Sequence, residues 1–249
     1  MHFELSSVIA QLYAPSSSAM LRQHSPQSIL ENVFDAVTTK DAAYVCYAHA
    51  PPVGAYDFRR PRLIASRGLS ESWTREYVEN RYSDIDPISR AALSVAFPFS
   101  LKNVTRITKV TKGEQRYLRR LEEQKLFSGL CVPVFGPRGR NGFFGIGFDD
   151  MTLKEDIKSV IEIQNFCQQA HLIYCELIQS QTPNEQNLSD REKDVLRLVL
   201  EGHSNKEISN QLGVSANSVA TYLSRAQAKL GTDHRFSSAT RALTLGMLD

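Results

Sequence analysis

The sequence has few of the features that mark secreted, membrane-spanning or strongly charged proteins. Its 249 residues include four scattered cysteines, too few for a disulfide framework and typical of a reducing cytoplasm. The longest apolar runs, such as residues 129–136, are far shorter than the roughly 20 residues of a spanning helix. The first twenty residues lack the basic start of a signal peptide. We therefore expect a cytoplasmic protein with no membrane partner, and the net charge of +2 means that any basic surface is local.

What the sequence does contain is a change of pattern near residue 180. Before it, helical patterns alternate with short β-branched or aromatic runs, and residues 130–148 are typical of a β-hairpin. This mixture predicts an α+β fold, an α/β/α sandwich with an antiparallel sheet. A polar stretch interrupted by Pro183 is typical of a linker. The predicted divisions are a first domain at 1–179, a linker at 180–187 and a second domain at 188–249.

The second domain is predicted to be all-helical, with four short helices. Ser189 with Glu192, and Ser204 with Glu207, have the spacing of capping boxes that begin two helices. Ser215 is placed to cap a third helix, whose apolar residues recur on one stripe. A helix–glycine–helix arrangement inside a four-helix core predicts a helix-turn-helix module, which binds double-stranded DNA through its third helix.

The stretch "LSDREKDVLRLVLEGHSNKEISNQLGVSANSVATYLSRAQAKLG" (188–231) resembles the DNA-binding domain of LuxR-type transcription regulators. Many members carry Lys or Arg directly after the valine of the third helix, where this chain has Ala220. Outward-facing positions of that helix therefore favour polar and methyl contacts with bases, while helix N-termini face phosphates. The candidate DNA-binding residues are Ser204, Asn205, Lys206, Ser215, Asn217, Ser218, Thr221, Ser224, Arg225 and Lys229.

The resemblance extends into the first domain through "SWTREYVENRYSDIDPISRAA" (72–92). Trp73, Tyr77, Asp86 and Pro87 match the W-x3-Y-x8-D-P pattern of quorum-sensing members, and Gly129 matches a glycine that opens a later strand. The resemblance implies a site for an acyl-homoserine lactone autoinducer. It implies that the Asp86 carboxylate accepts the ligand amide N–H, that the Trp73 indole N–H donates to the lactone carbonyl, and that Tyr77 packs along the ligand.

Two positions of this site depart from the family pattern. Leu69 stands where members often have an aromatic residue, and Leu101 where they often have a tryptophan. These changes remove a hydroxyl partner and a wall beside the lactone ring. Three possibilities follow: a lactone held by fewer contacts, a different small molecule, or a pocket no longer used.

The interpretation is a ligand-responsive transcription regulator that binds a pseudo-palindromic DNA site as a homodimer, and that contacts RNA polymerase if it activates transcription. Alternatives are a regulator that needs no ligand and an anti-activator that forms heterodimers. No cofactor and no enzymatic activity are expected. Cys167, His171 and Cys175 are spaced four residues apart on one predicted helix. Because no further ligand closes such a set, we expect a packing surface there and no metal.

Overall fold

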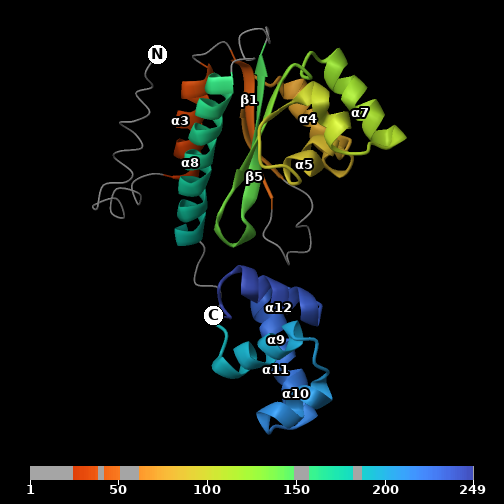
Figure 1. Cartoon of the computed structure of the whole chain (residues 1–249), viewed down its shortest axis with the longest axis vertical. Helices are drawn as coiled ribbons and strands as arrows, with labels where there is room; N and C mark the ends of the chain where they lie inside the picture. The colour runs from red at the N-terminus through yellow and green to blue at the C-terminus, as the bar shows by residue number, and fades with distance from the viewer. Residues whose placement is uncertain (1–24, 39–41, 51–61, 149–156, 182–186, 249) are drawn as a thin grey trace, which may run out of the picture. The chain divides into compact units, whose positions relative to one another are not determined.

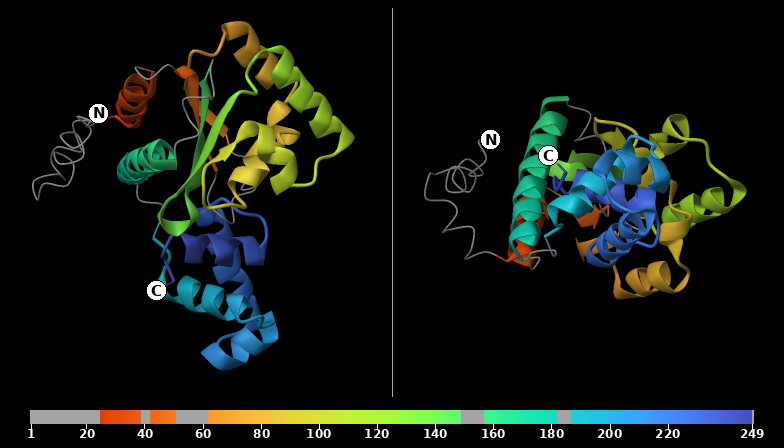
Figure 2. Two further views of the ribbon diagram at one scale, coloured as in Figure 1. Left: turned by 45° about the horizontal axis from the view of Figure 1, so that its top comes forward. Right: turned by 90° about the horizontal axis from the view of Figure 1, so that it is seen from below.

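The computed structural model describes residues 25–38, 42–50, 62–148, 157–181 and 187–248 (Figures 1 and 2). These residues form two compact units, one up to Gln181 and the other from Asn187 onward. The fold class predicted from the sequence is confirmed, with helices around an antiparallel sheet in the first unit and four helices in the second. No helix within these ranges combines the length and the apolar character needed to cross a lipid bilayer.

A five-stranded antiparallel sheet organises the first unit, in the order β2-β1-β5-β4-β3. The strands are β1 (Ala42–His49), β2 (Arg62–Arg67), β3 (Phe99–Ser100), β4 (Gly129–Phe135) and β5 (Asn141–Phe148). The predicted hairpin is formed by β4 and β5, which a short 3-10 turn at Pro137–Gly139 connects. Gly129 opens β4 opposite Gly147, and a Cβ at Gly129 would lie 2.3 Å from the carbonyl oxygen of Ile146.

Each face of the sheet is covered by its own helices (Figure 1). The helices α3 (Pro26–Thr38) and α8 (Ile157–Gln181) pack on one face. On the other face lie α4 (Glu71–Glu79), α5 (Pro87–Ala92), α6 (Val104–Ile107) and α7 (Lys112–Glu123), with short 3-10 turns at Tyr82–Asp84 and Leu101–Asn103.

Successive side chains of β1 point to opposite faces of the sheet, so they belong to two separate hydrophobic cores. Val45 and Tyr47 pack with α3 and α8, whereas Ala48 packs with the helices of the opposite face.

The predicted linker lies mostly beyond what the structure describes. Ser180 and Gln181 continue α8, and residues 182–186 are outside the described ranges, as are residues 1–24 of the predicted first domain. The start predicted for the long helix, residues 153–156, is also outside them. The domain boundaries therefore stay a prediction.

The second unit contains four helices around an apolar core. Ser189 and Ser204 begin two of them with complete capping boxes, and Ser215 caps the third by accepting from the Ser218 N–H. Gly213 and Gly231 end two helices with φ of +63° and +60°, a left-handed conformation that favours glycine. The helices are α9 (Asp190–Leu200), α10 (Asn205–Leu212), α11 (Ala216–Leu230) and α12 (Arg235–Thr244).

Candidate functional site

A largely apolar cavity of about 80 Å³ lies in the core between the sheet and the helices α4, α5 and α7. The strands β1 and β5 form its floor, with side chains that alternate away from the α8 face. Trp73, Tyr77 and Asp86 come together in its wall, as the sequence pattern predicts. The other lining residues are Tyr44, Cys46, Ala48, Leu69, Thr74, Ile88, Ser89, Leu101, Tyr117, Leu121, Leu126, Phe143 and Gly145.

Asp86 is held in place by the start of helix α5. It is the N-cap residue, and its Oδ1 accepts from the Ile88 backbone N–H at 2.8 Å. Its Oδ2 accepts longer hydrogen bonds from the hydroxyls of Ser89 (3.3 Å) and Tyr77 (3.4 Å). Burial raises the pKa of Asp86 to about 6, although these three donors act in the opposite direction. The carboxylate therefore keeps acceptor capacity toward the cavity and gains from a further donor.

Trp73 contributes an indole ring to the same wall. The side chain is buried, and its backbone N–H is bonded to the N-cap residue Ser70. Its indole N–H has no acceptor within the part of the chain that the structure describes. An N–H at the wall of an apolar cavity is suited to the carbonyl oxygen of a ligand.

The remaining predicted ligand residues divide into two groups. Leu69 and Leu101 line the cavity, so the two positions that depart from the family pattern do face the same space. Pro87 and Gly129 are not in its wall. Pro87 is buried as the first residue of α5, where its fixed φ suits a helix start. Gly129 allows two backbones to approach closely within the sheet.

Two tyrosines in the wall were missed by the sequence reasoning. The buried ring of Tyr117 lines the cavity and packs with Trp73 and Tyr77. Its hydroxyl makes no hydrogen bond within the described residues, so a ligand can supply its partner. Tyr44 differs, because its hydroxyl already donates to the carbonyl of Leu126 at 2.6 Å. No motif marks either tyrosine; only the meeting of β1, α4 and α7 does.

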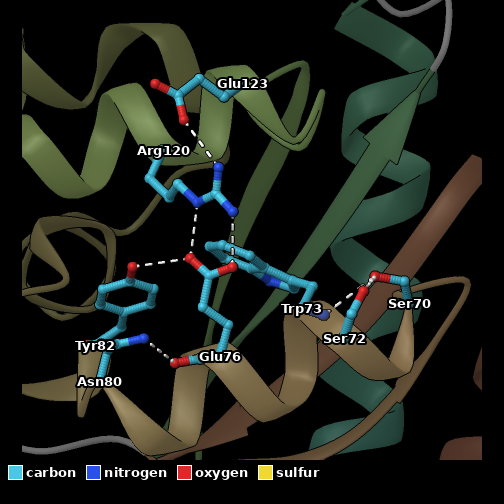
Figure 3. A network of polar contacts seen from close by, with 8 residues as sticks. All are labelled: Ser70, Ser72, Trp73, Glu76, Asn80, Tyr82, Arg120 and Glu123. Carbon is cyan, nitrogen blue, oxygen red and sulfur yellow. Dashed lines mark hydrogen bonds and ion pairs between the residues drawn. The ribbon is translucent and has the colours of Figure 1, made fainter.

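An ion-pair network joins α4 to α7 (Figure 3). Arg120 donates from Nε and Nη2 to the two carboxylate oxygens of Glu76, at 2.7 and 2.8 Å. Glu76 also accepts from the Tyr82 hydroxyl, and Arg120 also pairs with Glu123. The hydrogen bonds from Arg120 lower the pKa of Glu76, which stays ionised. Glu76 lies one turn after Trp73 on α4. The network therefore holds the part of α4 that carries Trp73 in place against α7.

In the second unit, the predicted recognition residues lie on and around α11. Asn217, Thr221, Ser224 and Arg225 are exposed, and Ala220 is exposed between them. Ser218 is half-buried and its backbone N–H donates to the cap Ser215. The Thr221 hydroxyl donates to the backbone carbonyl of Asn217. The outward face of α11 is thus polar and carries Arg225.

Other predicted DNA contacts have structural partners. Lys229 donates to the buried carboxylate of Glu192 at 2.7 Å and to a backbone carbonyl, so its ammonium ties α11 to α9. Burial of Glu192 opposes its ionisation, but the hydrogen bonds from Lys229 and Ser189 and the charge of Lys229 together outweigh burial and lower the pKa. Asn205 accepts from Arg235 at 3.1 Å. Ser204 and Lys206 are exposed at the start of α10.

Comparison with known proteins gives matches over both units. The profile described as "Autoinducer binding domain" matches residues 25–174, and that described as "Bacterial regulatory proteins, luxR family" matches residues 186–242. The transcriptional activator protein AnoR of Acinetobacter nosocomialis is 23% identical over 237 residues, covering 93% of this chain and 96% of that protein. LuxR of Aliivibrio fischeri is 26% identical over 186 residues, 72% of each chain.

Among solved structures, SdiA of Escherichia coli has the same fold. Its TM-score is 0.72 at 16% identity, with 98% of both chains covered. A second SdiA structure, in complex with octanoyl-rac-glycerol, has a TM-score of 0.67 over 98% of this chain and 96% of that one.

Proposed function

The chain belongs to the LuxR family of quorum-sensing transcription regulators, and from this premise we propose that it binds an acyl-homoserine lactone or a related acylated molecule around Asp86. Bound ligand completes the core of the first unit. The protein then binds a pseudo-palindromic DNA site as a cytoplasmic homodimer, and it contacts RNA polymerase if it activates transcription. Proteins of this family are transcription regulators, and we propose no catalytic step.

The observation that carries the ligand proposal is the pairing of an acceptor and a donor in one apolar cavity. Asp86 offers a carboxylate to a ligand amide N–H, and Trp73 offers an indole N–H to a ligand carbonyl. Tyr117 offers a hydroxyl that replaces the one lost with Leu69. An acylated lactone carries one amide N–H, two carbonyls and an apolar tail, which matches this small polar set on an apolar wall.

The cavity volume limits what fits without movement. At about 80 Å³ it is well below the roughly 300–1,000 Å³ of common ligand pockets. A compact head group fits the polar end, whereas an acyl chain requires apolar side chains such as Leu69, Leu101 and Leu121 to move. Binding of a long chain therefore includes repacking of the wall, and its affinity is reduced by that cost.

The ligand proposal is tested with the full-length chain and a panel of acyl-homoserine lactones, by calorimetry and thermal shift. Octanoyl glycerol is included as an acylated ligand without the amide. Asp86→Ala and Trp73→Phe should each lose affinity, while Glu79→Ala is a control because that exposed carboxylate is not in the cavity wall. Equal affinity of Asp86→Ala and the native protein would refute the assignment. Preference for octanoyl glycerol would favour a non-lactone ligand.

The DNA proposal rests on the exposed polar face of α11. Arg225→Ala should weaken operator binding by about 1–3 kcal/mol if the side chain contacts a base. Arg191→Ala on α9 is the control, since it removes the same charge from an exposed position outside the predicted interface. Fluorescence anisotropy at several salt concentrations measures both. Absence of DNA binding even at low salt would favour an anti-activator, because phosphate contacts are strongest there. Full binding without ligand would favour a ligand-independent regulator.

A further inference from the structure

Three potential metal ligands meet on the α8 face of the sheet, on the side opposite the Asp86 cavity. They are His49 at the end of β1, and His171 and Cys175 one turn apart on α8. One ligand atom from each lies within 4.8 Å of the others. His171 and Cys175 are buried and His49 is half-buried. The strand supplies the ligand that the helix pattern lacked, while Cys167, the other thiol of that pattern, is not in the cluster.

The separation of two of the three ligands matches tetrahedral zinc. Sγ of Cys175 and Nε2 of His171 are 3.5 Å apart. Bond lengths of about 2.3 Å for Zn–S and about 2.0 Å for Zn–N, at a tetrahedral angle, place the two ligand atoms about 3.5 Å from each other. The carbonyl oxygen of Arg140 lies 2.8 Å from Nε2 and 3.9 Å from Sγ. It lies near both ligand atoms and is a candidate fourth donor, through oxygen.

One tyrosine hydroxyl contacts the Nδ1 atoms of both imidazoles. The Tyr47 hydroxyl oxygen lies 2.8 Å from Nδ1 of His171 and 2.9 Å from Nδ1 of His49. Zinc-ligating histidines usually donate their second ring N–H to an oxygen acceptor, which sets the tautomer and the ring orientation. Tyr47 is fully buried and its oxygen can accept from both rings, which leaves each Nε2 to act as a ligand.

A glycine keeps the space between the donors open. A Cβ at Gly136 would lie 2.9 Å from Sγ of Cys175, 2.9 Å from Nε2 of His171 and 2.4 Å from the carbonyl oxygen of Arg140. A side chain at this position would place its Cβ too close to all three atoms.

We propose that His49, His171 and Cys175 form a binding site for a thiophilic divalent cation, Zn²⁺ in particular, that joins α8 to the end of β1. On binding, the Cys175 thiol releases one proton to solvent. The His171 proton moves from Nε2, where it faces the Arg140 carbonyl, to Nδ1, where it donates to Tyr47. No electron is transferred. The site does not depend on the autoinducer or on DNA, so its failure and that of the proposed function are separable.

Cobalt titration of the full-length chain, stripped with a chelator, tests this proposal. We expect one equivalent of Co²⁺ per chain, with a thiolate-to-cobalt charge-transfer band and the strong visible bands of a tetrahedral centre, displaced by Zn²⁺. Cys175→Ala should lose the charge-transfer band, while Cys167→Ala, a matched change on the same helix, should keep it. Binding of no more metal by the native chain than by Cys175→Ala would overturn the proposal, as would a band that depends on Cys167.

Two further variants separate a ligand role from a packing role. Tyr47→Phe keeps the ring but removes the oxygen behind both histidines, and should weaken Zn²⁺ binding by about 10–100-fold at unchanged stoichiometry. His49→Gln lies at a half-buried strand end, so it should remain folded by circular dichroism and lose more affinity than Tyr47→Phe. If the folded His49→Gln variant binds Zn²⁺ as the native chain does, the site is refuted.

Discussion

Asn in place of Asp86 should stabilise the ligand-free protein while it removes the response to ligand. In the folded chain, burial raises the pKa of the Asp86 carboxyl from 3.8 to about 6. The folded state therefore binds this proton more tightly than the unfolded state does. Ionisation of Asp86 at neutral pH opposes folding, and a neutral amide of the same shape removes that cost while it still caps α5.

The size of the effect follows from the pKa difference. Each pKa unit corresponds to about 1.4 kcal/mol, so a shift of roughly two units sets an upper limit of about 3 kcal/mol at pH 7.5. Because Asp86 is not wholly inaccessible, we expect a gain of about 1–3 kcal/mol in the free energy of unfolding. The cost of ionisation is complete above about pH 6 and disappears below about pH 4, where both states are protonated. At pH 5 the advantage of Asp86→Asn should fall to about half.

Urea unfolding of full-length native and Asp86→Asn protein, at pH 7.5 and pH 5 without ligand, measures this difference. In thermal unfolding, the Tm of Asp86→Asn should be higher than that of the native protein by about 2–4 °C for each kcal/mol of stabilisation. Glu79→Gln on α4 controls for the loss of an exposed carboxylate. Equal stability of Asp86→Asn and native protein at pH 7.5, or a gap that does not narrow at pH 5, would show that the carboxylate is not held in a costly environment.

Three further outcomes are expected. Ligand affinity measured from pH 5 to 8 should be constant above about pH 6 and fall by up to about tenfold per unit below it, since a ligand N–H needs the ionised Asp86; a flat profile would contradict that contact. Glu76→Gln should lower ligand affinity, because α4 loses its two-point bond to Arg120, whereas Glu123→Gln should change affinity little; calorimetry that ranks them in reverse would contradict the role given to this network. Lys229→Met should lower the free energy of unfolding of the second unit by about 1–3 kcal/mol, because the buried Glu192 loses its charged partner. A urea midpoint equal to that of the native protein would show that this ion pair does not contribute to stability.

The autoinducer-binding motif shows how far sequence alone could locate the candidate site. Trp73, Tyr77 and Asp86 lie within fourteen residues of each other, and the resemblance of this one segment to quorum-sensing regulators predicted that they belong to one site. Pro87 and Gly129 belong to the same pattern, yet they support the helix start and the strand contact and do not line the cavity. The motif therefore locates the segment that forms the cavity, but it does not show which of its residues line the cavity and which support the fold.

Sequence by itself determined the elements whose signals are local. The capping boxes at Ser189 and Ser204 and the left-handed glycines predicted the second unit, because a cap is decided by neighbours three residues apart. Tertiary structure decided which distant residues share a space. Tyr117 reaches the cavity, Lys229 pairs with Glu192, and His49 joins His171 only after helices and strands from opposite ends of the unit pack together. These contacts depend on the order of the strands in the sheet and on the face that each helix buries. Neither can be predicted from a single local segment of the sequence.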